Sequence, residues 1–397
     1  MWLAAGWGWW PVSDTAERHI MIAGVTTRAL AVSAARAGYR VTAIDAFGDR
    51  DLRAVADVIV APRSPGQRYS PLRAAAAGGQ VPASAVAYTS NFENYPAAVS
   101  SLARDRELLG NPPQILERVR DPLELSRTLR RLGYPAPLVR LTPPAVPQRG
   151  RRWLLKPRRS GGGHGVQKWH RGSPIPRSMY LQERMSGPAG SIIFASAGKQ
   201  AVVLGLSRQL VGETSLGARG FRYCGNLLAG TAALFPHQAE LLDRAAELAA
   251  ALTREFDLRG LNGIDFIARA GIPYPIEVNP RFSGSMELLE RGCGMSMFEV
   301  HAAACRGRLP TPSTPAGMVQ GKAIVFARRT LRIGDSSFWH LRRDLADLPH
   351  PGEWIQRDRP ICTVFAEAPT GESCRGRLLR MAAAVYRAAG QPLRRAS

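Results

Sequence analysis

Hydrophobic and polar positions in the first part of the chain follow the order strand, helix, strand. Residues 21–25 (MIAGV) are uniformly apolar, as in a buried strand, and residues 26–39 carry apolar side chains at helical spacing. Residues 41–45 (VTAID) have a second strand pattern, and two further apolar runs continue the alternation to about residue 90. We therefore predict an α/β fold that begins with a Rossmann-like domain over residues 21–95.

The turn after the first strand argues against a nicotinamide cofactor. A dinucleotide-binding Rossmann domain carries GxGxxG at this place, because its backbone must approach a pyrophosphate. Here the turn holds Gly24 alone, followed by Val25 and two threonines. The fold class stands, but NAD is not expected.

The pattern changes after residue 95. Residues 95–133 are charged and helical in pattern, and residues 141–150 (LTPPAVPQRG) are rich in proline, which is typical of a boundary. Downstream, residues 191–210 predict a hairpin of two apolar strands, and residues 236–256 predict a helix with one apolar face. Residues 1–20, rich in Trp and Gly, fit no element and are left as an unassigned tail, so Met21 could equally be the functional start.

The most informative segment is LNGIDFIARAGIPYPIEVNPRFSGS, residues 261–285. Its two apolar strands flank a turn centred on Gly271, so antiparallel pairing about that centre places Asp265 opposite Glu277. Period-two alternation puts Asn279 and Arg281 on the same face. By the same alternation, the side chains between them are expected to point into the core; these are Ile276 and Val278.

Two carboxylates that face each other across a sheet repel unless a cation lies between them. Carboxylate and amide oxygens are the ligands that Mg²⁺ prefers, commonly shared with nucleotide phosphates. We therefore predict a Mg²⁺ site at Asp265, Glu277 and Asn279, with a solvated hairpin face as the alternative.

A glycine-rich loop follows a short strand that bears Lys156. The loop reads Ser160-Gly-Gly-Gly-His-Gly165, a composition used where backbone must approach a ligand, and it favours a phosphate-binding loop over a plain hairpin turn. Its spacing is not that of a Walker P-loop, and a protein kinase is excluded because Lys156 precedes the glycines. Further on, Gln182 and Glu183 lie at a strand end, where polar groups can meet an adenine edge or a ribose.

Composition restricts the partners. The chain of 397 residues has 53 Lys and Arg against 31 Asp and Glu, a formal net charge of +22. Such a charge would suggest nucleic acid or an acidic substrate. However, the sequence has only four lysines, so the excess of basic residues is arginine, in a chain rich in Ala, Gly and Pro. No long basic run interleaved with aromatic residues occurs. Nucleic acid is therefore not the expected partner.

Cysteine usage and hydropathy point to a soluble, cytoplasmic protein. The five cysteines are scattered and form no CxxC pair, which argues against a disulfide framework and a zinc site. No apolar run is long enough to span a membrane, and the start of the chain lacks the basic flank of a secretory signal.

Taken together, the Lys156 strand, the glycine loop, Gln182-Glu183 and the motifs GIDF and IEVNPRFSGS resemble the ATP-grasp superfamily, in the carboligase branch related to biotin carboxylase. The resemblance covers roughly residues 21–366 and includes the strand-rich C-terminal part. It implies a division after the Rossmann-like domain. The predicted parts are a helical linker (96–145), an ATP-grasp lid (146–190), an ATP-grasp core (191–310) and C-terminal strands with a closing helix (311–397).

The resemblance also implies roles for particular residues. Lys156 would contact the nucleotide phosphates and Arg281 would stabilise an acyl-phosphate, which makes these two the catalytic candidates. The loop would fold over the phosphates, while Gln182, Glu183 and the Met185 backbone would hold adenine and ribose. The loop positions implied in nucleotide binding are Ser160, Gly161, Gly162, Gly163 and Gly165. The candidates for the substrate end are Arg208, Arg222, Asn226, Ser283 and Ser285.

The implied reaction is an ATP- and Mg²⁺-dependent ligation, with Mn²⁺ as a substitute metal. A carboxylate is activated to an acyl-phosphate, an amine attacks it, and ADP and phosphate leave. The chain shows no match to the carboxylase elements for bicarbonate and biotin, so a carboxylate–amine ligase is favoured, one that could add glutamate or another amino acid to a small carrier molecule. The resemblance allows a homodimer. Two alternatives stay open: a nucleic-acid-binding protein on a non-catalytic scaffold, and a small-acid binder that uses ADP structurally.

Overall fold

A computed structural model describes residues 18–61, 69–143, 152–230, 232–311, 317–336, 339 and 341–390. The predicted 1–20 tail and the proline-rich boundary at 141–150 lie largely outside the described residues. Within the described ranges, no helix is long and apolar enough to cross a membrane.

The N-terminal part is a parallel sheet flanked by short helices. Its strands lie in the order β3-β2-β1-β4-β5. Their bounds are β1 His19–Ala23, β2 Arg40–Asp45, β3 Asp57–Val60, β4 Ala85–Tyr88 and β5 Glu107–Leu109. The helices that follow these strands are α1 Arg28–Arg36, α2 Arg50–Arg53, α3 Pro71–Ala77 and α4 Pro96–Leu102, with 3-10 turns at Gly78–Gln80 (η1) and Phe92–Asn94 (η2). The predicted βαβ unit is confirmed as β1, α1 and β2.

Two helices and a small antiparallel sheet lead into the central region. The helices are α5 Pro113–Val119 and α6 Pro122–Arg131, and α6 begins where the Asp121 carboxylate accepts the Leu123 and Glu124 amides. The small sheet has the order β6-β9-β7-β8 and carries its own minor core. Its strands are β6 Val139–Arg140, β7 Trp153–Pro157, β8 Gln167–Lys168 and β9 Met179–Glu183.

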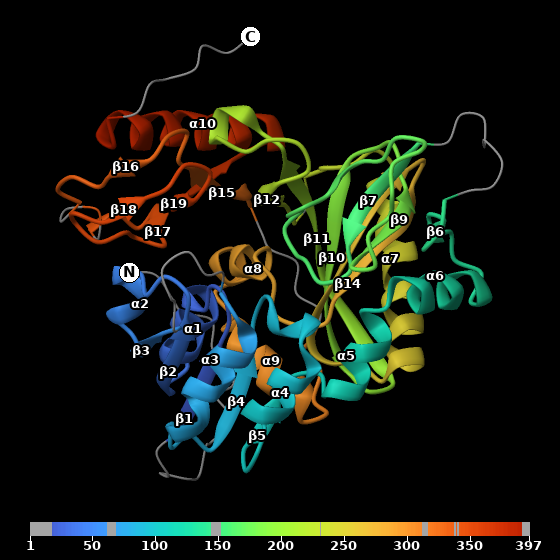
Figure 1. The fold of residues 1–397 in the computed structure, drawn as a ribbon, viewed down its shortest axis with the longest axis horizontal. Helices are drawn as coiled ribbons and strands as arrows, with labels where there is room; N and C mark the ends of the chain where they lie inside the picture. Colours follow the sequence, from blue (N-terminus) through green and yellow to red (C-terminus); the bar gives the residue numbers. More distant parts are fainter. Residues whose placement is uncertain are drawn as a thin grey trace.

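An eight-stranded antiparallel sheet forms the body of the molecule, in the order β14-β13-β10-β11-β12-β15-β19-β17. Its strands are β10 Ala189–Ala197, β11 Gln200–Val211, β12 Tyr223–Leu228, β13 Arg259–Arg269, β14 Ile272–Asn279, β15 Val319–Phe326, β17 Leu345–Ala346 and β19 Pro360–Ala368. The remaining elements are η3 Thr214–Leu216, α7 Gln238–Phe256, α8 Met286–Cys293, α9 Met297–Cys305, the pair β16 Leu331–Arg332 and β18 Trp354–Ile355, and α10 Gly371–Ala388. Figure 1 shows α7 beside β14 and α10 above the C-terminal strands.

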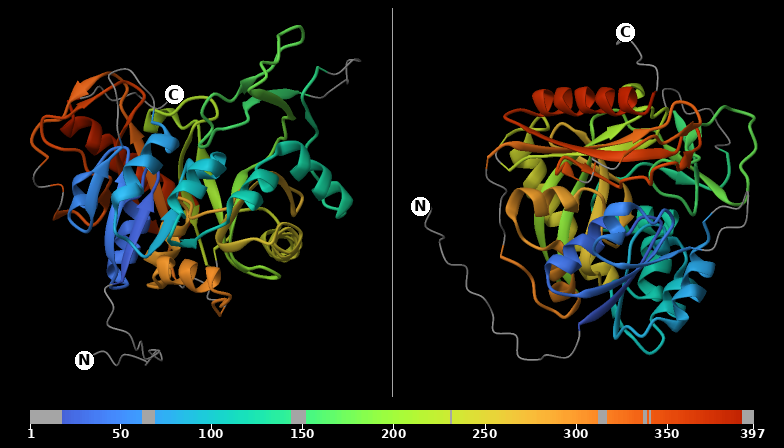
Figure 2. Two further views of the ribbon diagram at one scale, coloured as in Figure 1. Left: turned by 60° about the horizontal axis from the view of Figure 1, so that its bottom comes forward. Right: turned by 90° about the vertical axis from the view of Figure 1, so that its left-hand side faces the viewer.

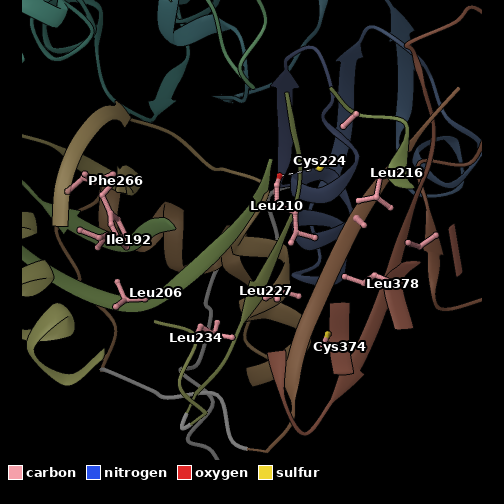
Figure 3. Close-up of a cluster of buried hydrophobic side chains, with 14 of the residues drawn as sticks. Ile192, Leu206, Leu210, Leu216, Cys224, Leu227, Leu234, Phe266, Cys374 and Leu378 are labelled. Atoms are coloured by element: carbon pink, nitrogen blue, oxygen red, sulfur yellow. Dashed lines mark hydrogen bonds between the residues drawn. The ribbon is translucent and has the colours of Figure 1, made fainter. Parts of the chain in front are cut away.

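The largest apolar core lies between the strands of the big sheet and the two long helices. α7 contributes Leu241, Leu248 and Phe256, and α10 contributes Leu378, all buried. Figure 3 shows Leu378 and Cys374 near Leu227 of the sheet. Figure 2 shows α10 stacked on the C-terminal strands in its right-hand view. The predicted hairpin at 191–210 is confirmed as β10 and β11, and the helix predicted at 236–256 as α7.

Two features differ from the sequence prediction. The stretch 95–133 is not continuously helical, since strand β5 lies within it and extends the parallel sheet beyond residue 95. The three residues of β5 are too short a run to stand out from their charged neighbours. In addition, the large sheet continues across residue 310 without a break, because β12 pairs directly with β15.

A buried group of charges joins the N-terminal part to the large sheet, and we call it the Arg28 cluster. Arg28, at the start of α1, donates to both oxygens of Glu287 in α8, and its Nε lies 2.9 Å from Asp347 Oδ1. Lys322 of β15 donates to Glu287 at 2.7 Å. Side chains from segments some 260 and 320 residues apart in sequence thus fix how the two sheets meet.

Candidate active site

The hairpin of β13 and β14 places the predicted carboxylates opposite each other, but by a route that the sequence pattern did not show. The turn is the two-residue Ala270-Gly271, both with positive φ (47° and 71°), and this turn alone would pair Asp265 with Ile276. A bulge between Asp265 and Phe266 shifts the register by one residue and restores the pairing of Asp265 with Glu277.

The bulge also overturns the prediction for Ile276. Val278 is buried as expected, at 1% exposure, whereas Ile276 is half-buried and lines the cleft described below. A bulged residue has no partner of its own in the ladder. The Ile276 carbonyl instead accepts the Gln182 Nε2 amide at 3.1 Å, which links the hairpin to strand β9.

The electrostatics of the carboxylate pair suit a cation. Burial, and then the neighbouring charge of Glu277, raise the pKa of Asp265 to about 6. Burial also acts to raise the pKa of Glu277, but Arg120 and Lys156 outweigh it and hold that pKa below its usual range. Asn279 donates to Asp265 Oδ2 at 3.1 Å.

A divalent cation between these oxygens would relieve the repulsion that the Asp265 pKa records, so the residues fit Mg²⁺. Within the described ranges there is no group of three or more His, Cys, Asp and Glu that could hold a metal. Two carboxylates and an amide would therefore share the ion with nucleotide phosphates and water.

The nucleotide-side candidates meet on the small sheet. Lys156 of β7 and Gln182 of β9 are both buried, and Lys156 Nζ donates to Gln182 Oε1 at 3.0 Å. Burial acts to lower the pKa of Lys156, but Tyr180 and Glu277 outweigh it, so the pKa is raised and the ammonium stays charged. Glu183 accepts the Leu138 amide at 3.2 Å.

One cleft of about 1350 Å³ brings almost all the predicted residues together. It is lined by the whole loop 160–165, the carboxylate hairpin and Met185, and it reaches the turn after β1. Its lining also includes Lys156, Gln182, Glu183, Asp265, Glu277, Asn279 and Arg281, together with the substrate candidates Arg208, Arg222, Asn226, Ser283 and Ser285.

The glycine loop lies against the segment that precedes β12. The Gly162 carbonyl accepts the Tyr223 amide at 3.0 Å, and the Ser160 hydroxyl donates to the His164 carbonyl at 2.6 Å. A Cβ on Gly163 would lie 1.8 Å from the Phe221 carbonyl oxygen, and its φ is +74°. Only glycine fits there, because both the backbone conformation and the space exclude a side chain.

Gly163→Ala is therefore expected to displace the loop and lower ATP turnover by about a hundredfold, the scale for a shift of about 1 Å in a site. The matched control is Gly79→Ala in η1, outside the cleft, since a Cβ there also meets nothing within 4 Å. Steady-state ADP release with varied ATP measures both. Equal turnover in the two variants would show that the close contact of the loop with the Phe221 carbonyl is not needed for ATP turnover.

Sequence reasoning missed Arg120, which lies just before α6. Its Nη1 donates to Glu277 Oε1 at 2.6 Å and to the Val278 carbonyl, while Nη2 reaches Asn94 Oδ1 at 2.8 Å and the Ser160 carbonyl at 3.2 Å. Arg120 thus connects the carboxylate hairpin, the glycine loop and the N-terminal part. No local motif marks it, because it sits in a charged stretch among other arginines.

The substrate-end candidates divide into two kinds. Asn226 is 1% exposed; its amide donates to Ser207 at 3.0 Å and its oxygen accepts from Tyr223, so it is held within the sheet. Ser283 and Ser285 have their hydroxyls 3.2 Å apart. By contrast, Arg208 is exposed and Arg222 half-buried, and both residues belong to the cleft lining.

Arg222 has a cationic neighbour that sequence reasoning also missed. Its Nη1 donates to the Asp358 carbonyl at 2.8 Å and its guanidinium lies 4.6 Å from the centre of the Phe326 ring. Burial, and the charge of Arg359 beside it, lower the pKa of Arg222. Arg359 lines the same cleft, so two arginines lie together at this end.

Comparison with known proteins finds a domain match in the middle of the chain. Residues 119–285 match the ATP-grasp domain. An uncharacterised protein of Methanocaldococcus jannaschii is 28% identical over 129 residues, which span 32% of this chain and 31% of that protein, so the match covers about a third of each.

Solved structures share the fold at low identity. Biotin carboxylase of Campylobacter jejuni superposes with a TM-score of 0.69 at 14% identity, covering 91% of this chain and 89% of that one. N5-carboxyaminoimidazole ribonucleotide synthetase of Thermus thermophilus gives 0.64 at 18%, with 95% and 100% covered. L-amino acid ligase of Bacillus licheniformis gives 0.66 at 14%, with 92% and 97% covered.

These findings confirm the predicted resemblance to ATP-grasp proteins and the α/β fold class. The use of ATP with Mg²⁺ and an enzymatic activity stay predictions. The roles of individual residues stay predictions. Residues 119–285, which match the ATP-grasp domain, hold the loop, the Lys156 strand and the carboxylate hairpin.

Proposed function

We propose that this protein is a carboxylate–amine ligase that works through an acyl-phosphate and releases ADP and phosphate. The observation that carries the proposal is a single cleft in which a buried lysine, a facing carboxylate pair and a buried arginine converge. Phosphoryl transfer needs positioning and charge neutralisation more than covalent help from protein, and this set supplies both.

In this proposal a substrate carboxylate oxygen attacks the γ-phosphorus of ATP, and the bond to the β-phosphate oxygen breaks to release ADP. The amine then attacks the carbonyl carbon of the acyl-phosphate, loses a proton, and phosphate leaves as the amide forms. Lys156 holds the phosphates. Asp265, Glu277 and Asn279 would hold Mg²⁺, which would supply neutralisation of the phosphate charge.

Arg281 is the candidate for stabilising the acyl-phosphate. It is 8% exposed and lines the cleft, and its Nε is buried without a hydrogen-bond partner among the described residues. An N–H that no described residue accepts supports Arg281 as a donor to charge that develops on an acyl-phosphate. Its other nitrogens are already engaged, Nη1 with the Phe282 carbonyl at 2.9 Å and Nη2 with Asn279 at 3.2 Å.

The other end of the cleft favours an acidic substrate. Arg208, Arg222 and Arg359 line it, and the nearby Asp358 carboxylate is paired with Arg357 at 3.7 Å. We propose that these arginines receive a second carboxylate, as in glutamate or a carrier that bears it.

The first experiment is ATP turnover with Mg²⁺ across a panel of amino acids and small acids. ADP with phosphate is measured separately from AMP with pyrophosphate. Acid-dependent ADP and phosphate would support the ligase, whereas AMP, or no turnover with any acid or pair of substrates, would contradict it. Sedimentation of the same preparation decides whether the chain forms the homodimer that the resemblance allows.

Arg222→Gln should raise KM for the acidic substrate by about tenfold or more, because a charge-assisted hydrogen bond to it is lost. KM for ATP should not change. The control is Arg244→Gln, which removes a positive charge from the exposed face of α7, away from the cleft. An equal effect of both variants would mean that Arg222 acts only through net charge.

A further inference from the structure

Glu93 is a buried carboxylate in the N-terminal part that faces the ATP-grasp domain. It lies in the short turn η2, after strand β4, and is 1% exposed, its side chain not at all. Neither carboxylate oxygen has a hydrogen bond within the described residues, yet Arg281 Nη2 lies 2.7 Å from Oε1. An ionised carboxylate in such a place is stable only beside a positive charge.

The ion pair restricts Arg281. Its Nη2 lies between the Glu93 carboxylate and Asn279 Oδ1, while Nη1 is held by the Phe282 carbonyl. These contacts with the two terminal nitrogens fix the orientation of the guanidinium plane. The remaining nitrogen, Nε, is buried without a hydrogen-bond partner among the described residues, on a side chain that belongs to the cleft lining. Glu93 therefore helps to fix the orientation of the Arg281 guanidinium group beside the cleft.

The same turn holds the second arginine of the site. Asn94, the next residue, accepts Arg120 Nε at 3.1 Å and Nη2 at 2.8 Å through its Oδ1. Arg120 in turn holds Glu277 and the carbonyl of Ser160. Two residues of η2, Glu93 and Asn94, thus contact two of the cations that border the carboxylate hairpin, from outside the matched ATP-grasp domain.

We propose that Glu93 is a positioning residue that orients Arg281 toward the acyl-phosphate, so that the N-terminal part completes the active site. The proposal rests on the proposed function of Arg281. Glu93 does not line the cleft, so it acts through Arg281 and not on the substrate. This positioning role differs from a purely structural role, in which Glu93 would stabilise the fold and its replacement would leave the turnover of folded protein unchanged.

The test is a double-mutant cycle in the full chain, with the panel substrate that supports turnover. Glu93→Gln should lower kcat by about tenfold to a hundredfold, the usual cost of removing a group that orients a functional side chain, with KM for ATP unchanged. Glu93→Asp keeps the charge and should recover part of the loss. In an Arg281→Lys background, Glu93→Gln should add almost no further loss.

Controls separate positioning from folding. Glu107→Gln removes another carboxylate of the N-terminal part, one that pairs with Arg306 of the region after α9 at 2.7 Å, and it should leave kcat unchanged. All variants are assayed well below their thermal midpoints. Independent losses that multiply in the double variant, or a kcat for Glu93→Gln equal to the wild type, would overturn the proposal.

A second measurement does not depend on turnover. In protein labelled with ¹⁵N-arginine, the Nε–H signal of Arg281, identified by its loss in Arg281→Lys, should shift or broaden in Glu93→Gln and stay in place in Glu107→Gln. An unchanged signal would overturn the positioning role even if the wild type proves active. If the wild type is inactive but the Arg281 signal shifts in Glu93→Gln, the proposed ligase function is contradicted while the orientation of Arg281 by Glu93 is supported.

Discussion

Glu277→Ala should reduce acid-dependent ADP formation by at least about a hundredfold, the scale for losing a group that stabilises transition-state charge. Two effects combine. The proposed Mg²⁺ site keeps one carboxylate instead of two, and Arg120 loses the partner that lies 2.6 Å from its Nη1. The measurement is initial rates of ADP and phosphate release over a range of Mg²⁺ concentrations.

The control for that change is Glu367→Ala. Glu367 is an exposed carboxylate on β19 of the same sheet, outside the cleft, and its loss should leave turnover intact. Circular dichroism of both variants checks that each is folded. Wild-type rates in folded Glu277→Ala would contradict the assignment of the carboxylate hairpin to metal and nucleotide binding.

Glu287→Gln should destabilise the protein at neutral pH by about 3–5 kcal/mol, because removing one partner of a buried charge group leaves the others uncompensated. Glu287 accepts from Arg28 and from Lys322 at 2.7 Å, and all three side chains are nearly buried. Urea unfolding at neutral pH measures the difference in free energy of unfolding from the wild type.

The pH dependence of that difference tests its electrostatic origin. Burial acts to raise the pKa of Glu287, but Arg28 and Lys322 outweigh it and hold the pKa far below its ordinary value of 4.5. A group with a depressed pKa contributes stability above its unfolded pKa and loses that contribution as the pH falls toward the folded pKa. The gap between wild type and Glu287→Gln should therefore shrink below about pH 4.5.

Two aspartates next to the Arg28 cluster, at the start of α2, have pKa values shifted in the opposite direction. Burial, followed by the charge of Asp347, raises the pKa of Asp49 to about 9 and that of Asp51 above its usual range. These groups are present in both proteins, so the comparison isolates Glu287. A gap that stays constant from pH 7 down to pH 2.5 would mean that packing, and not charge, accounts for the loss.

The carboxylate hairpin shows how much of the strand register the apolar pattern alone can predict. Apolar alternation around one glycine was enough to pair Asp265 with Glu277, because the residue numbers are symmetric about 271. The pairing is correct, yet it depends on a two-residue turn and a bulge whose shifts cancel. The same bulge turned Ile276 toward the cleft, which no alternation rule could show, because a bulge breaks the period on which the rule relies.

Residues that are adjacent in space but distant in sequence are the ones that the sequence could not predict. Lys156, the glycine loop and the motif around Glu277 each carry a local pattern, so the sequence alone was enough to predict that they form one nucleotide site. Arg120 and Glu93 lie in no recognisable local motif. Arg120 is 157 residues from Glu277, and Glu93 is ion-paired with Arg281 across the join between two sheets.

The sequence by itself determined the fold class, the order of the elements and the local motifs, because periodicity and glycine placement are properties of short segments. The tertiary structure alone decided which charges neutralise each other. The partners of Arg28, Arg120 and Arg281 come from distant segments, and their ion pairs exist because folding buries them side by side. Burial makes such pairing obligatory, since an unpaired charge in the interior is too costly to keep.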